Sequence, residues 1–268
     1  MVNNRMQQTD HLRDVAYKDT KNLNARIRFW EQYGETGEEA FSKFFDEMVV
    51  PENARILDIG CGPSHYWQWG LENDRVASSW SMTLTDLSQG MIDDARKNVA
   101  ARPDKFAFEI ADVCDLQFAD ETFDVVTANY MLYHARDLDQ AISEIARVLK
   151  PGGRLYAKTN SENHIVEFLD LQNKLIIDES ERKNIGLAHA AFTLENGGAV
   201  IEKHFSVVEI QHDNSICEAT DPEIVIDYAM SMDANLDEQR LRTTVEAEIK
   251  TVGYFKVTRS SGMFIAQK

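Results

Sequence analysis

Hydrophobic residues recur at two different spacings along the chain, and the two spacings alternate between residues 54 and 160. Short apolar runs predict strands at 54–59, 81–85, 106–110, 123–128 and 154–158. Between these runs the apolar residues fall three or four apart, as in amphipathic helices, and Ser88 and Asp137 stand where they can cap two of those helices. Strands that alternate with helices at this spacing predict a parallel, doubly wound α/β sheet with right-handed crossovers.

The chain beyond residue 160 predicts two further strands and a helical cap. Strand-like runs at 205–210 and 263–266 would complete a seven-stranded sheet. Helices are predicted from Ser161, from Asp221-Pro222 and over residues 241–252. These helices would form cap insertions at about 161–200 and 219–252, close to the last strands.

Residues 1–50 are predicted to form a helical arm ahead of the sheet domain, which takes residues 51–268. Apolar residues from about Asn22 onward lie at helical spacing, and Thr36 begins a T-x-x-E capping box for a second helix. Residues 1–33 hold six Lys and Arg against four Asp and Glu, although the whole chain has a net charge of −17. This basic and aromatic arm is predicted either to close over a ligand as a lid or to stay docked on the body.

Composition narrows the classes of partner. With 43% hydrophobic residues among 268, the chain can bury a full core. A net charge of −17 disfavours nucleic acid, because binding a phosphate track needs clustered cations. The three cysteines lie far apart and form no CxxC pair, which predicts a reduced, cytoplasmic protein without a metal site. No run resembles a secretion signal or is long enough to cross a bilayer, so we expect no membrane partner.

The most informative stretch is the glycine motif that closes the first predicted strand. Gly60 and Gly62 allow a ligand to lie directly on the backbone, where a Cβ would clash, and the next helix points its amide donors at that ligand. A dinucleotide fingerprint would require a third glycine where His65 stands. Asp58, two residues before the first glycine, favours a ligand that carries an ammonium group over a diphosphate.

Further polar residues follow the next three predicted strands. Asp86 ends the second strand, where a carboxylate can accept hydrogen bonds from both ribose hydroxyls, and Asp112 follows the third, where it can accept from an adenine amine. The segment from Asn129 to His134 follows the fourth strand. Because the carboxyl ends of parallel strands share one edge of the sheet, one ligand can span all of these residues at the topological switch point.

In this order, the motifs resemble those of the class I S-adenosylmethionine-dependent methyltransferases, in particular the branch of ubiquinone- and menaquinone-biosynthesis methyltransferases (methyltransferase domain 11 type). The resemblance covers about residues 52–160 and implies a Rossmann-like sheet that binds S-adenosylmethionine. The cofactor contacts that it implies are Asp58, Gly60, Cys61 and Gly62 around the methionine, Asp86 at the ribose, Leu87, Met91, Asp112 and Val113 around the adenine, and the Asn129 carbonyl beside the sulfonium. Tyr33 of the arm is a further candidate contact.

The reaction that the resemblance implies is an in-line transfer of a methyl group to a small-molecule acceptor, at oxygen or nitrogen. The donor is already activated, so the protein mainly positions the acceptor and excludes water. A general base is needed only for a protonated acceptor, and His134 is the best candidate because imidazole titrates near neutral pH. Tyr130 is a second candidate beside the transferred methyl group, and packing is the alternative for both side chains. The predicted assembly is a homodimer.

Two other classes of protein stay open. One is an NAD(P)-dependent oxidoreductase, which His65 at the third glycine position disfavours. The other is a non-catalytic module that binds S-adenosylmethionine, which the sequence does not exclude.

Overall fold

The computed structural model describes residues 21–34, 37–177, 190–232 and 236–268. Residues 1–20, the capping box at Thr36 and part of the predicted cap at 178–189 lie outside the described residues. The described ranges include every other residue named above as a candidate for the site.

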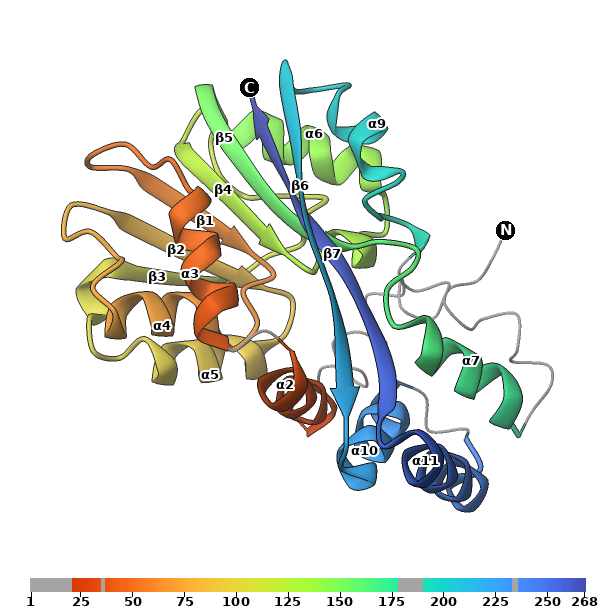
Figure 1. Cartoon of the computed structure of the whole chain (residues 1–268). Helices are drawn as coiled ribbons and strands as arrows, with labels where there is room; N and C mark the ends of the chain where they lie inside the picture. The colour runs from red at the N-terminus through yellow and green to blue at the C-terminus, as the bar shows by residue number, and fades with distance from the viewer. Residues whose placement is uncertain (1–20, 35–36, 178–189, 233–235) are drawn as a thin grey trace.

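A seven-stranded sheet forms the centre of the molecule, in the order β3-β2-β1-β4-β5-β7-β6 (Figure 1). Its strands are β1 (Arg55–Ile59), β2 (Ser81–Asp86), β3 (Phe106–Ile110), β4 (Phe123–Asn129), β5 (Leu149–Asn160), β6 (Val207–Ala219) and β7 (Phe255–Gln267). The first five strands are parallel, whereas β7 is antiparallel to both β5 and β6. The strand order reverses between β1 and β4, which confirms the predicted doubly wound sheet with its switch point at the ends of these two strands.

Helices cover both faces of the sheet and its lower end (Figure 1). The longer ones are α2 (Lys21–Tyr33), α3 (Gly37–Glu47), α4 (His65–Glu72), α5 (Gln89–Asn98), α6 (Leu138–Val148), α7 (Val166–Leu175), α10 (Pro222–Met232) and α11 (Glu238–Val252), with a short α9 (Gly197–Ile201). The predicted caps are confirmed, because Ser88 accepts a hydrogen bond from the Met91 N–H and Asp137 accepts one from the Gln140 N–H.

Three hydrophobic clusters hold these layers together. The first packs α6, through residues such as Ile142, against one face of the sheet, and the second packs α3 and α4, through Phe44 and Trp67, against the other face. The third lies at the lower end, where α2, α7, α10 and α11 surround the ends of β6 and β7. The predicted helical arm and helical cap therefore share one core, with Phe29 of α2 fully buried in it.

Several of the predicted boundaries are wrong. The strand predicted at 154–158 begins earlier, at Leu149 of β5. The strands predicted at 205–210 and 263–266 run over 13 residues each as β6 and β7. The two strands pair with each other along their full length, so their backbone groups are hydrogen-bonded even where the side chains are polar. The apolar pattern therefore marks only part of each strand. The helix predicted from Ser161 begins at Val166, because Ile165 has a left-handed backbone with a φ of +51° and interrupts the helix there.

Candidate functional site

The glycine loop between β1 and α4 has the conformation that its sequence predicts. Gly60 and Gly62 have φ angles of +63° and +53°, in the left-handed region. A Cβ on Gly60 would lie 2.8 Å from the Cβ of Met131, so this glycine allows the loop to pack against the chain that follows β4. A Cβ on Gly62 would meet no heavy atom within 4 Å, so a ligand can reach the backbone at this point.

Asp86 joins the glycine loop to the end of β2. Its Oδ2 accepts a 3.0 Å hydrogen bond from the Gly62 N–H, and its Oδ1 accepts a 2.9 Å bond from the Ser88 N–H. Burial raises the pKa of Asp86, and these backbone bonds oppose the rise. Each carboxylate oxygen keeps a further lone pair, so Asp86 can still accept hydrogen bonds from a ligand. Leu87 and Met91 adjoin it in the chain, half-buried and buried respectively.

Asp58 accepts one hydrogen bond within the protein on each carboxylate oxygen. Its side chain is buried, and it accepts hydrogen bonds from the Trp67 indole at 2.9 Å and from the Thr127 hydroxyl at 2.6 Å. Burial raises the pKa of Asp58 to about 7, against the lowering effect of these two bonds. The carboxyl thus ties β1 to α4 and to β4. Sequence reasoning missed Trp67 as its partner, because the pairing depends on how α4 packs over the sheet.

Asp112 and Val113 lie in the loop that follows β3. Asp112 accepts a 2.8 Å hydrogen bond from the Cys114 N–H, and its other oxygen lies 3.6 Å from the Arg136 guanidinium. Val113 is buried. The Asp112 carboxylate is half-exposed. It lies at the same edge of the sheet as Asp86, because β2 and β3 are paired in register up to Asp86 and Ile110.

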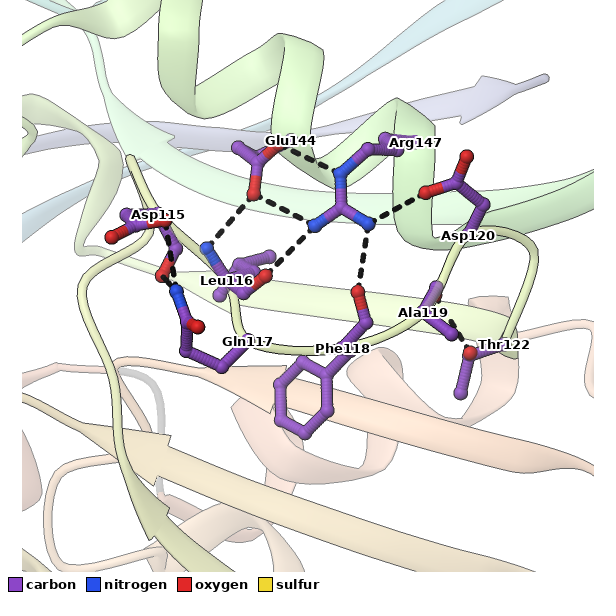
Figure 2. Close-up of polar contacts among 9 residues, drawn as sticks. All are labelled: Asp115, Leu116, Gln117, Phe118, Ala119, Asp120, Thr122, Glu144 and Arg147. Atoms are coloured by element: carbon purple, nitrogen blue, oxygen red, sulfur yellow. Dashed lines mark hydrogen bonds and ion pairs between the residues drawn. The ribbon is translucent and has the colours of Figure 1, made fainter.

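A clamp on α6 fixes the rest of this loop (Figure 2). The Arg147 guanidinium donates to the carbonyls of Leu116 and Phe118, at 2.8 and 2.7 Å, and Glu144 accepts from the Leu116 N–H at 2.8 Å. Arg147 also bonds to both carboxylate oxygens of Glu144. The sequence pattern gave Arg147 no role at this site. Arg147 fixes the part of the loop that leads from Asp112 to β4.

The segment after β4 brings Asn129 and Tyr130 to the same edge. Asn129 Oδ1 is buried and accepts no hydrogen bond from any residue in the described ranges. Tyr130 has a φ of +56°, a strained conformation for a bulky residue, and its N–H donates a 3.0 Å bond to the Lys158 carbonyl. His134 ends the 3₁₀ turn Leu132–His134, and its ring centroid lies 4.5 Å from that of Tyr133.

The arm residues lie in a different environment. The Tyr33 hydroxyl accepts a 2.8 Å hydrogen bond from the Asp221 N–H at the start of α10. Arg26 donates to the hydroxyl and the carbonyl of Ser231, which is also on α10. The structure therefore gathers the predicted contacts from Asp58 to Asn129 at the strand ends and docks Tyr33 against α10. A cofactor contact of Tyr33 and a lid function of the arm both stay predictions.

Two further properties concern the described ranges. They contain no group of three or more His, Cys, Asp and Glu side chains arranged to hold a metal ion. No helix within them is long and apolar enough to cross a membrane.

Comparisons with known proteins match the same part of the chain. Residues 57–157 match a family model described as a methyltransferase domain. The chain is 32% identical over 142 residues to methyltransferase GfsG of Streptomyces halstedii, covering 49% of each chain. It is 35% identical over 120 residues to a demethylmenaquinone methyltransferase of Symbiobacterium thermophilum, covering 42% of this chain and 47% of that one. The chain thus spans about half the length of the curated relatives it matches.

The fold is similar to that of a phosphoethanolamine N-methyltransferase 2 from Haemonchus contortus, whose structure was solved with S-adenosyl-L-methionine. The TM-score is 0.60 at 21% identity, and the alignment covers 100% of this chain and 60% of the other. Residues 57–157 therefore match a methyltransferase domain, and the sheet around them has the fold of a solved methyltransferase.

Proposed function

We propose that this protein transfers the methyl group of S-adenosylmethionine to a small-molecule acceptor, at oxygen or nitrogen. The observation that carries the proposal is the bond between Asp86 and the Gly62 amide, which joins the carboxylate predicted to bind the ribose to a glycine loop open to a ligand. Both residues lie inside the matched range 57–157. The relatives named above are methyltransferases, and one acts on demethylmenaquinone by its name, which supports a small acceptor.

The strand-end residues fit this cofactor in chemistry as well as in position. The loop at Gly60, Cys61 and Gly62 would hold its methionine part, and the orphaned Asn129 Oδ1 is a buried acceptor that an ammonium donor could satisfy. Asp86 has lone pairs left for the ribose hydroxyls. The adenine contacts would come from Leu87, Met91, Asp112 and Val113.

The chemistry of this site depends on how the protein places the acceptor. When bound, the cofactor supplies a methyl group to a nucleophile that lies in line with the breaking carbon–sulfur bond. Tyr130 and His134, on the turn after β4, would border the acceptor on the side of the reacting carbon. His134 would take the proton of an acceptor that arrives as an alcohol, phenol or ammonium. An acceptor that is already deprotonated needs no base.

The composition supports a proposal for the location of the enzyme, and one edge strand of the sheet supports a proposal for its assembly. A net charge of −17 and three free cysteines support a cytoplasmic enzyme that does not act on nucleic acid. A homodimer is supported by β6, an edge strand that exposes Ile210 and Ile216. Light scattering on the purified protein measures its assembly, and a monomer at micromolar concentration would contradict the dimer.

Isothermal titration with S-adenosylmethionine, S-adenosylhomocysteine and NAD tests the proposed function. We expect both sulfur compounds to bind one per chain and NAD to bind at least about tenfold more weakly. Preferential binding of NAD would support the oxidoreductase alternative and overturn the proposal. Tight binding of S-adenosylmethionine without turnover on any small acceptor would favour a non-catalytic module.

A further inference from the structure

Lys158 is a buried cation without an ion-pair partner in the described part of the chain. It lies near the end of β5 and is 7% exposed. Its Nζ donates one long hydrogen bond, of 3.4 Å, to the Tyr66 hydroxyl. It also lies 5.2 Å from the ring centroid of Tyr66 and 5.7 Å from that of Phe44. The ion pairs among the described residues do not include Lys158.

The nearby carboxylates do not neutralise it. Asp213 pairs with Arg259, and its other oxygen lies 3.6 Å from Lys43. Glu47, at the end of α3, is half-buried, and burial raises its pKa even though Lys158 and Lys43 act to lower it. An ammonium that is removed from water without a paired anion is costly to bury, and aromatic rings compensate only part of that cost.

Lys158 nevertheless keeps its proton. Burial lowers its pKa, its interactions with Tyr66, Tyr130 and Asp213 raise it, and the net direction is upward. Burial also raises the pKa of Tyr66, so its hydroxyl stays protonated. Since the Tyr66 oxygen accepts from Lys158, its own O–H can donate to a third group.

The position of Lys158 places this charge beside the candidate reaction centre. Lys158 is paired in register with Asn129 on the neighbouring parallel strand, about 4.8 Å away. Its carbonyl accepts the bond that holds Tyr130 in its left-handed conformation. Register-paired residues point to the same face of a sheet, so the ammonium and the orphaned Asn129 Oδ1 share one face.

We propose that Lys158 binds an anionic oxygen of the methyl acceptor, with the Tyr66 hydroxyl as the second donor. The acceptor is then a small molecule that carries a carboxylate or a phosphate close to the atom that is methylated. The acceptor supplies the anionic partner that Lys158 lacks among the described residues. Lys158 therefore selects acceptors by their charge. This inference rests on the proposed function, because it assigns the substrate class of the same site.

The test measures the binding of simple probes to the full chain saturated with S-adenosylhomocysteine. The anionic probes are acetate, benzoate and phenyl phosphate, and the uncharged and cationic controls are benzyl alcohol and benzylamine. We expect at least one anion to bind about tenfold or more tightly than both controls. Comparison of the anions shows whether a carboxylate or a phosphate is preferred. Lys158→Met should abolish this preference, Lys158→Arg should retain it, and the exposed Lys43→Met should leave it unchanged.

The outcomes separate this inference from the proposed function. If wild-type protein binds S-adenosylhomocysteine but prefers none of the anions, the inference fails and the proposed function stands. If Lys158→Met loses more than about tenfold in affinity for S-adenosylhomocysteine, Lys158 binds the carboxylate of the cofactor and the inference is overturned. If the wild type does not bind S-adenosylhomocysteine at all, both fail. Melting temperatures show that the variants are folded, and we expect Lys158→Met to melt no lower than wild type.

Discussion

At the scale of single residues, Asp58 links stability to pH. Its pKa is about 7 in the folded protein, against an ordinary value of 3.8, because burial penalises the charged form. A carboxyl whose pKa is higher in the folded chain binds its proton more tightly there than in the unfolded chain. Its contribution to the free energy of unfolding is therefore fully present below about pH 4 and is lost as the pH rises toward 7.

We expect Asp58→Asn to remove this pH dependence. The amide keeps an oxygen for the Trp67 indole and offers an N–H to the Thr127 hydroxyl, so both bonded partners of Asp58 stay satisfied. Between pH 5 and 8 the free energy of unfolding of the wild type should fall relative to the variant by about 2–3 kcal/mol. Urea unfolding of both proteins at the two pH values measures the difference. Parallel pH profiles would show that Asp58 does not titrate in this range.

At the scale of elements, the α6 clamp is the main support of the loop that carries Asp112. Arg147 has a side chain 30% exposed and donates to two loop carbonyls and to Glu144, whereas its fourth partner, Asp120, is 75% exposed (Figure 2). The buried bonds should dominate, because an exposed ion pair contributes little.

We expect Arg147→Ala to lower the free energy of unfolding by about 2–3 kcal/mol, because two loop carbonyls and Glu144 lose their donor. S-adenosylhomocysteine should bind several-fold more weakly, since Asp112 loses its fixed position. Chemical denaturation and titration measure the two effects. Asp120→Ala is the matched control and should change neither. An Arg147→Ala protein as stable as wild type would mean that the loop holds its shape unaided.

At the scale of the whole molecule, the N-terminal helix and the C-terminal helices form one unit. Phe29 of α2 is fully buried, with ring centroids 5.6 Å from Phe168 and 5.0 Å from Tyr228. These three residues come from α2, α7 and α10, so the segments before and after the matched domain stabilise each other.

We expect Phe29→Ala to lower the free energy of unfolding by about 3–5 kcal/mol, through lost burial and the cavity left behind. The affinity for S-adenosylhomocysteine should change little, because the strand-end residues do not pack on Phe29. Denaturant unfolding and titration of the variant measure both quantities. A large loss of affinity in a folded variant would instead support the arm as part of the binding site. Gln32→Ala, an exposed position on the same helix, is the control.

The limits of sequence reasoning follow from which contacts are local. The parallel strands, the Ser88 and Asp137 caps and the glycine loop depend on neighbouring residues, so their patterns predict them. Lys158 illustrates the opposite case, because its importance depends on the register of β5 against β4 and on the packing of α4 over both. The lengths of β6 and β7 were missed for a similar reason, since the two strands support each other where neither has an apolar pattern.

We propose that the strand ends bind S-adenosylmethionine, with Asp86 at its ribose. The most direct test is titration of S-adenosylhomocysteine into wild type and Asp86→Ala, with exposed Glu109→Ala as the control. We predict that Asp86→Ala weakens binding by about 2–3 kcal/mol, or roughly 30- to 150-fold, because it removes a charged acceptor for the ribose hydroxyls and releases the Gly62 amide. Glu109→Ala should bind as wild type does. Unchanged affinity in a folded Asp86→Ala protein would show that Asp86 does not bind the ribose.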